Sequence, residues 1–150
     1  MQVRLDVTDG HTICRPVGAL DAYSAPSARE AMALFTSVPK LIVDLSEVPF
    51  IDSAGLRALV ASTRRVRDNG GQVAICSPQP QVGALLDAVA LGAVVCIVRT
   101  VDEACRMLIR QAESNSIGRH GWSAGRPNMT NGSVPMRTVG ARSAYREGVR

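Results

Sequence analysis

One serine, Ser53, is the residue of this chain best placed to take part in chemistry. The segment PFIDSAGLRALV, residues 49–60, sets it directly after Asp52 and two residues before Gly55. An apolar run, LIVDL, precedes this segment, and apolar residues at helical spacing follow the serine. A hydroxyl between a strand and a helix can act as a helix cap, as a nucleophile or as a phosphate acceptor.

The cap interpretation follows from the helix that the sequence predicts. Apolar positions recur at i, i+3, i+4 and i+7, namely Leu56, Leu59, Val60 and Thr63. A serine at the start of such a helix can accept hydrogen bonds from first-turn amides and stabilise it by about 1 kcal/mol. We therefore expect Ser53 to cap the helix, whatever else it does.

A nucleophilic role is disfavoured by the neighbouring residues. The nucleophile elbow of hydrolases requires G-x-S-x-G, whereas Ile51 and Gly55 flank this serine. A serine nucleophile also needs a base. The two histidines are His11, in an N-terminal hairpin, and His120, in the C-terminal segment. We expect no catalytic residues and no enzyme activity.

The third interpretation is a phosphate acceptor. A hydroxyl at a helix start lies near the surface, and free first-turn amides tolerate an added dianion there. Phosphorylation would add about −2 charge beside Asp52 and Glu47. Such a cluster of like charges would repel a docking partner while the domain stays folded.

Composition predicts neither a metal nor a cofactor. The four cysteines are dispersed without a CxxC motif, and the two histidines have no other ligand type at metal spacing. We expect Cys14, Cys76, Cys96 and Cys105 to be buried reduced thiols that pack as small hydrophobes.

The chain is expected to be cytoplasmic, without a membrane span. Its start, MQVRLDVTDG, lacks a secretory pattern, and no apolar window approaches the roughly 20 residues of a membrane helix. Residues 1–113 carry 11 basic and 12 acidic side chains, or −1, whereas residues 114–150 carry six arginines and Glu147, or +5. We therefore do not expect the folded part to bind nucleic acid, and only the basic tail could support such binding.

The elements that position Ser53 alternate between strand and helix. We expect a first strand with Val3, Leu5 and Val7 half buried, a turn at Asp9-Gly10, and a return strand over 11–17. Strands then follow over 40–45, 72–76 and 94–98. The helices are expected after Ser24 or Ser27, over 54–68, from Ser77-Pro78 to Gly92, and over 101–111 with Thr100 and Glu103 as a capping box.

This order, ββαβαβαβα, predicts an α/β fold with a mixed β-sheet and packed helices. Residues 1–113 form the predicted domain. Residues 114–150 are rich in Gly, Ser, Asn and Arg and lack a sustained apolar period. We expect this basic tail to be disordered because it buries too little to offset ordering entropy.

Residues 2–112 resemble the STAS domain of bacterial anti-sigma factor antagonists. The resemblance is carried by LIVDLSEVPFIDSAGLRALV, by GALD at residues 18–21 and by NGGQVAIC at residues 69–76. It implies the STAS fold and a partner-switching role in transcription. In that family the unmodified antagonist binds an anti-sigma factor, typically a GHKL-type serine kinase, and so frees a sigma factor. The kinase phosphorylates the serine of the D-S motif, here Ser53, and a serine phosphatase reverses the modification.

The resemblance and helix geometry together predict the partner-binding residues, which are Asp21, Asp52, Ser53, Ala54, Gly55, Arg57 and Arg64. Arg57 and Arg64 share the polar face of the predicted helix. Many family members carry a second hydroxyl after the acceptor, whereas Ala54 leaves Ser53 alone in the turn. A non-phosphorylated STAS scaffold in a multiprotein or lipid-transport assembly stays open as an alternative.

Overall fold

The computed structural model describes the backbone of residues 1–123 and the side chains of residues 1–115. Five strands form one sheet in the order β1-β2-β3-β4-β5, with β1 antiparallel to β2 and all other neighbours parallel. The strands are β1 (Gln2–Thr8), β2 (His11–Val17), β3 (Lys40–Asp44), β4 (Gln72–Cys76) and β5 (Cys96–Val98).

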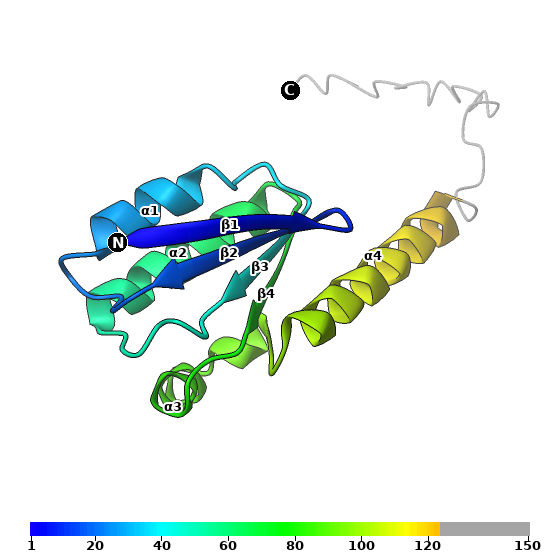
Figure 1. Cartoon of the computed structure of the whole chain (residues 1–150). Helices are drawn as coiled ribbons and strands as arrows, with labels where there is room; N and C mark the ends of the chain where they lie inside the picture. The colour runs from blue at the N-terminus through cyan, green and yellow to red at the C-terminus, as the bar shows by residue number, and fades with distance from the viewer. Residues whose placement is uncertain (124–150) are drawn as a thin grey trace, which may run out of the picture.

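Four α-helices connect or follow these strands (Figure 1). They are α1 (Ala25–Ala33), α2 (Ser53–Asp68), α3 (Pro80–Ala88) and α4 (Val101–Ser123), with a 3-10 turn at Leu91–Ala93. The predicted mixed α/β fold and the order ββαβαβαβα are confirmed.

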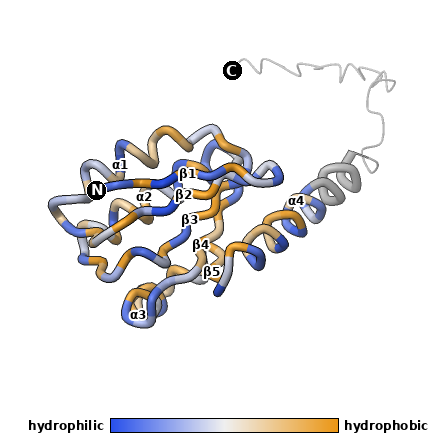
Figure 2. Tube along the Cα trace, in the orientation of Figure 1, coloured by the Kyte–Doolittle hydropathy of each residue, from blue (hydrophilic) through white to orange (hydrophobic). Residues whose placement is uncertain are grey.

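Both faces of the central strands are buried, which explains their continuous apolar runs (Figure 2). Successive residues of β3 point to opposite faces. Leu41 and Val43 pack with α1, α2 and α3, whereas Ile42 packs with Ala104 and Leu108 of α4. The sheet therefore has α1, α2 and α3 packed on one face and α4 packed on the other.

The tight turn was predicted correctly, and α1 begins at one of its two predicted positions, but the predicted start of α3 was wrong. Asp9 and Gly10 have φ of 49° and 76°, as a two-residue hairpin turn requires. Helix α1 begins after Ser24, so the box expected at Ser27 is not its start. Helix α3 begins at Pro80, because Ser77 has a φ of 55° and its hydroxyl donates to the Arg99 carbonyl.

The edge strands are more exposed than predicted. Val3 contacts the core, but the side chains of Leu5 and Val7 are 53% and 72% exposed, because the helix layer does not extend over this part of β1. The run over 94–98 was expected to be covered on both faces. Its strand, β5, has only three residues, lies at the other edge and is half buried.

Helix α4 begins as predicted and ends later. The Thr100 hydroxyl accepts from the Glu103 amide at 3.2 Å, and the Glu103 carboxylate accepts from the Arg99 amide at 2.9 Å. The helix continues to Ser123, past the boundary predicted at residue 114. Glycines in this stretch lower helix propensity but do not break a helix as proline does. The rest of the predicted tail lies outside the described residues.

Candidate functional site

Ser53 is the first residue of α2, and its side chain is exposed. The chain leaves β3 at the carboxyl edge of the sheet, forms a loop and returns as this helix. Within residues 1–115 the Ser53 hydroxyl has no hydrogen-bond partner, and the Ser53 carbonyl accepts from Arg57 Nε at 3.2 Å. The hydroxyl is therefore available to another molecule.

The cap of α2 is Asp52, so the prediction that Ser53 caps the helix is wrong. Asp52 has extended backbone angles, and its Oδ1 accepts from the amides of Ala54 and Gly55, both at 2.8 Å. The carboxylate one residue earlier reaches the first-turn amides, and Ser53 is already helical. Those two amides are therefore not free to bind a phosphate group. This contradicts the expectation that free first-turn amides would accommodate a phosphate on Ser53.

Asp52 also fixes the neighbouring loop. Its Oδ2 accepts from the Ala22 amide at 3.0 Å, and its own amide donates to the Leu20 carbonyl at 3.1 Å. The Leu20 amide in turn donates to the Phe50 carbonyl at 2.9 Å. One carboxylate thus joins the loop after β2 to the start of α2 and presents Ser53 on a rigid edge.

The predicted cluster of like charges is partly neutralised. Glu47 forms an ion pair with Arg4 at 2.8 Å, and the Asp52 carboxylate is occupied by three backbone amides. The side chain of Arg57 lies one turn from Ser53. A phosphate on Ser53 would therefore face both signs of charge.

The structure explains why residue 55 is a glycine, which the sequence did not reveal. Gly55 is buried, and a Cβ at this position would lie 1.9 Å from the Leu20 carbonyl oxygen. Only glycine permits this approach of α2 to the loop. Gly55 therefore contributes packing, and neighbouring Ala54 is half buried.

Asp21 lies in the loop that Asp52 holds, but its carboxylate is used internally. Its Oδ1 accepts from the amides of Tyr23 and Ser24, at 3.0 and 2.9 Å. These bonds, chiefly the one from the Ser24 amide, lower the pKa of Asp21 below its ordinary value. Asp21 thus shapes the loop beside Ser53 as an Asx turn.

Arg57 and Arg64 are exposed on the same side of α2, as predicted. They border an apolar groove of about 590 Å³ between α2 and the segment after α3. Its floor includes Leu56, Val60 and Leu91. The groove begins one turn from Ser53 and extends the surface that a partner could contact.

Two exposed aromatic residues near Ser53 were not predicted. Tyr23 is 94% exposed on the loop next to Asp52, and Phe50 is 53% exposed two residues before Asp52. Exposed aromatic side chains are typical of protein contact surfaces. Because aromatic residues make up only 3% of this chain, their positions in two loops were a usable signal.

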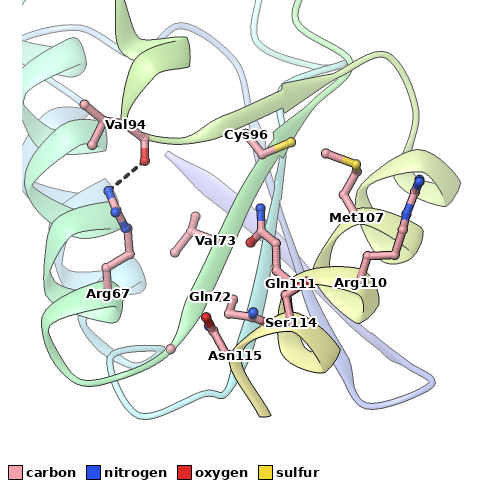
Figure 3. A pocket seen from close by; sticks show the side chains of 11 residues that line it. Arg67, Gln72, Val73, Val94, Cys96, Met107, Arg110, Gln111, Ser114 and Asn115 are labelled. Carbon is pink, nitrogen blue, oxygen red and sulfur yellow. Dashed lines mark hydrogen bonds between the residues drawn. The ribbon is translucent and has the colours of Figure 1, made fainter. Parts of the chain in front are cut away.

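The described residues offer Ser53 no catalytic base. His11 is buried at the opposite end of β2, and the side chain of His120 lies outside the described part. A larger cavity, about 620 Å³, lies between α2 and α4, where Arg67 and Arg110 approach it from opposite sides (Figure 3). Among the residues whose side chains are described, neither a histidine nor a carboxylate lines it.

The thiols match the prediction in part. All four cysteines are free, Cys14 and Cys76 are buried, and Cys96 and Cys105 are half buried. Burial raises the pKa of both Cys14 and Cys76 to about 12. Within the described residues there is no cluster of metal-binding side chains, and no helix has the length and apolarity to cross a membrane.

The fold and the surface around Ser53 are those of a small α/β interaction domain. The chain belongs to the STAS domain family, whose model matches residues 2–104. It is 26% identical over 92 residues to the anti-sigma F factor antagonist of Paenibacillus polymyxa, covering 58% of this chain and 77% of that protein.

Solved structures agree with this assignment. A proposed anti-sigma factor antagonist of Thermotoga maritima matches with a TM-score of 0.66 and 26% identity, over 71% of this chain and 93% of that one. The antagonist SpoIIAA matches in its unphosphorylated form, with a TM-score of 0.56, 18% identity and coverage of 73% and 98%. Its phosphorylated form matches with a TM-score of 0.56 and 21% identity, over 71% of this chain and 99% of that one. At these identities SpoIIAA shows the fold alone.

Proposed function

We propose that this chain is an anti-sigma factor antagonist whose partner binding is switched by phosphorylation of Ser53. In the unmodified state it binds an anti-sigma factor and so releases a sigma factor. The observation that carries this proposal is the exposed Ser53 hydroxyl, which Asp52 presents at the start of α2 without using it as a cap. The relatives named as anti-sigma factor antagonists support the same role.

The contact surface is centred on Ser53. We assign to this surface the exposed side chains of Arg57, one turn along α2, and of Tyr23 and Phe50, on the two loops that meet at Asp52. The groove bordered by Arg64 continues it along α2. Asp21, Asp52, Ala54 and Gly55 act mainly by holding this surface in shape. The partner is a GHKL-type serine kinase, and a serine phosphatase restores the unmodified state, in the cytoplasm.

Phosphorylation acts by changing the surface and not the fold. A phosphate at the first residue of α2 lies at the positive end of the helix dipole, where an anion is tolerated. In a docked complex it would need desolvation and would displace the partner from the hydroxyl. A 100-fold loss of affinity requires only about 2.7 kcal/mol, which one desolvated charge at an interface can supply.

The test is incubation of the full chain with its cognate anti-sigma factor kinase and Mg-ATP, followed by peptide mass spectrometry. We expect one phosphate on Ser53 and none on Ser53→Ala. Ser46→Ala removes another exposed hydroxyl at the same sheet edge and serves as the control, with phosphorylation unchanged.

Binding measurements complete the test. Ser53→Ala should bind the anti-sigma factor even in the presence of ATP, and Ser53→Asp should bind at least tenfold more weakly with an unchanged circular-dichroism spectrum. If the parent is not phosphorylated and both variants bind the anti-sigma factor as the parent does, the proposed phosphorylation switch is wrong. The protein then acts as a non-phosphorylated STAS scaffold.

A further inference from the structure

Strand β1 is a long unpaired edge. It has seven residues, lies at the end of the sheet and pairs only with β2 among the described strands (Figure 1). Such an edge presents free amides and carbonyls to another strand. Natural proteins usually shield edges with proline, a bulge or inward-pointing charges, and β1 has a regular register without proline.

One side of β1 is apolar and exposed. Val3, Leu5 and Val7 alternate with polar residues, and Leu5 and Val7 keep 53% and 72% of their surface exposed. Exposed branched residues on an edge strand indicate a surface that another strand can cover.

The hairpin decides which backbone groups face outward. The Asp9-Gly10 turn is closed by Thr8 and His11, and in a two-residue hairpin this closing pair exchanges both hydrogen bonds. Thr8 and every second residue before it therefore face β2. The amides and carbonyls of Val3, Leu5 and Val7 point away from the sheet.

We propose that two copies of this chain associate through β1, which pairs antiparallel with β1 of the second copy about a two-fold axis at Leu5. The outward backbone groups of Leu5 then bond their own counterparts, and those of Val3 bond Val7 of the second copy. The two sheets become one continuous sheet.

The charges of β1 select this register. On the other side of the strand, Arg4 lies opposite Asp6 of the second copy in both halves of the dimer. A shift of the axis by one residue would still let outward backbone groups pair, for example Val3 with Leu5 of the second copy, but it would put Arg4 opposite Arg4 or Asp6 opposite Asp6. Arg4 already bonds Glu47 through Nη1, and its guanidinium has further donors for Asp6.

The contact is small. A single strand pairing with a few side chains buries less than the roughly 1,200 Å² of a stable interface, so we expect a weak, concentration-dependent dimer in the micromolar range. The inference does not depend on the proposed function, because it involves neither Ser53 nor phosphorylation.

Charge exchange tests the register. Sedimentation velocity of the full chain between about 1 and 200 μM should show a monomer–dimer equilibrium. Asp6→Arg should weaken dimerisation at least tenfold by placing like charges opposite each other. Adding Arg4→Asp should restore it to within about threefold, although the bond to Glu47 is lost. A monomeric parent over this range, or a double variant as weak as the single one, overturns the proposal.

Cysteine crosslinking tests the axis independently. Because Cys14 lies directly opposite Leu5 on β2, both cysteine variants are made in a Cys14→Ser background. Leu5→Cys then places two thiols opposite each other at the axis, about 5.5 Å apart between Cα atoms, which suits a disulfide. Val3→Cys is the matched control, because its two thiols would lie four residues apart along the strands, about 13 Å. Under mild oxidation Leu5→Cys should form covalent dimers, and Val3→Cys should form no more than the parent. Equal crosslinking of both variants overturns the axis.

Discussion

Replacement of Asp52 by alanine removes the acceptor of three backbone hydrogen bonds at the site. Two come from the first turn of α2, at Ala54 and Gly55, and one comes from Ala22 in the loop after β2. The cap bonds contribute about 1 kcal/mol, and the bond to the loop contributes about 1 kcal/mol more. We expect Asp52→Ala to lower the free energy of unfolding by about 2 kcal/mol.

The matched comparison is Ser53→Ala. Its hydroxyl has no partner within the described side chains, so we expect a change within about 0.5 kcal/mol. Asp52→Asn keeps one acceptor oxygen and should lie between the two.

Urea unfolding followed by circular dichroism measures all three variants, with equal m-values as the condition for comparison. A 2 kcal/mol loss corresponds to a melting temperature about 8 °C lower for a domain of this size. If Ser53→Ala loses as much stability as Asp52→Ala, the serine is the cap and the assignment made from the structure is wrong.

Three further predictions concern the interior. Gly55→Ala puts a methyl group 1.9 Å from the Leu20 carbonyl oxygen and should cost about 3 kcal/mol in urea unfolding; a neutral result would contradict the close approach. Burial alone would raise the pKa of Asp44, but hydrogen bonds from Arg15 Nε, at 2.7 Å, and from Ser46 hold it below the ordinary value. Because the folded pKa is lowered, the ionised carboxylate stabilises the protein above about pH 4, and this stability is lost as the pH falls through the folded pKa. Asp44→Asn should therefore be about 2 kcal/mol less stable than the parent at pH 7, and the difference should shrink as the pH is lowered below about 4. Because burial raises the pKa of Cys14 and Cys76 to about 12, iodoacetamide at pH 8 should modify neither before unfolding; rapid labelling would refute their inertness.

Local sequence patterns were sufficient for most of the fold. The alternation in residues 2–17, the Asp9-Gly10 turn and the continuous apolar runs of β3 and β4 are short-range signals that tertiary contacts did not override. The edges were harder to predict. The same apolar run is consistent with a covered strand or an exposed edge, and β5 and β1 are edges because of their positions in the sheet order.

The start of α2 beside Ser53 was predicted from the sequence, but the cap was assigned to the wrong residue. Asp52 and Ser53 are adjacent and both can cap a helix, so only the backbone angles decide between them. The scarcity of aromatic residues could have drawn attention to Tyr23 and Phe50, but a single sequence does not show that their two loops, nearly thirty residues apart, meet at Asp52.

The sequence by itself determined the strand and helix order, the turn before β2 and the position of a lone hydroxyl at the start of α2. These depend on periodicity and on residue chemistry within a few positions. Only the tertiary structure decided that Asp52 is the cap, that Gly55 touches Leu20 and that β1 keeps an exposed edge. Each of these depends on which backbone groups approach one another across the fold, and local propensity does not contain that information.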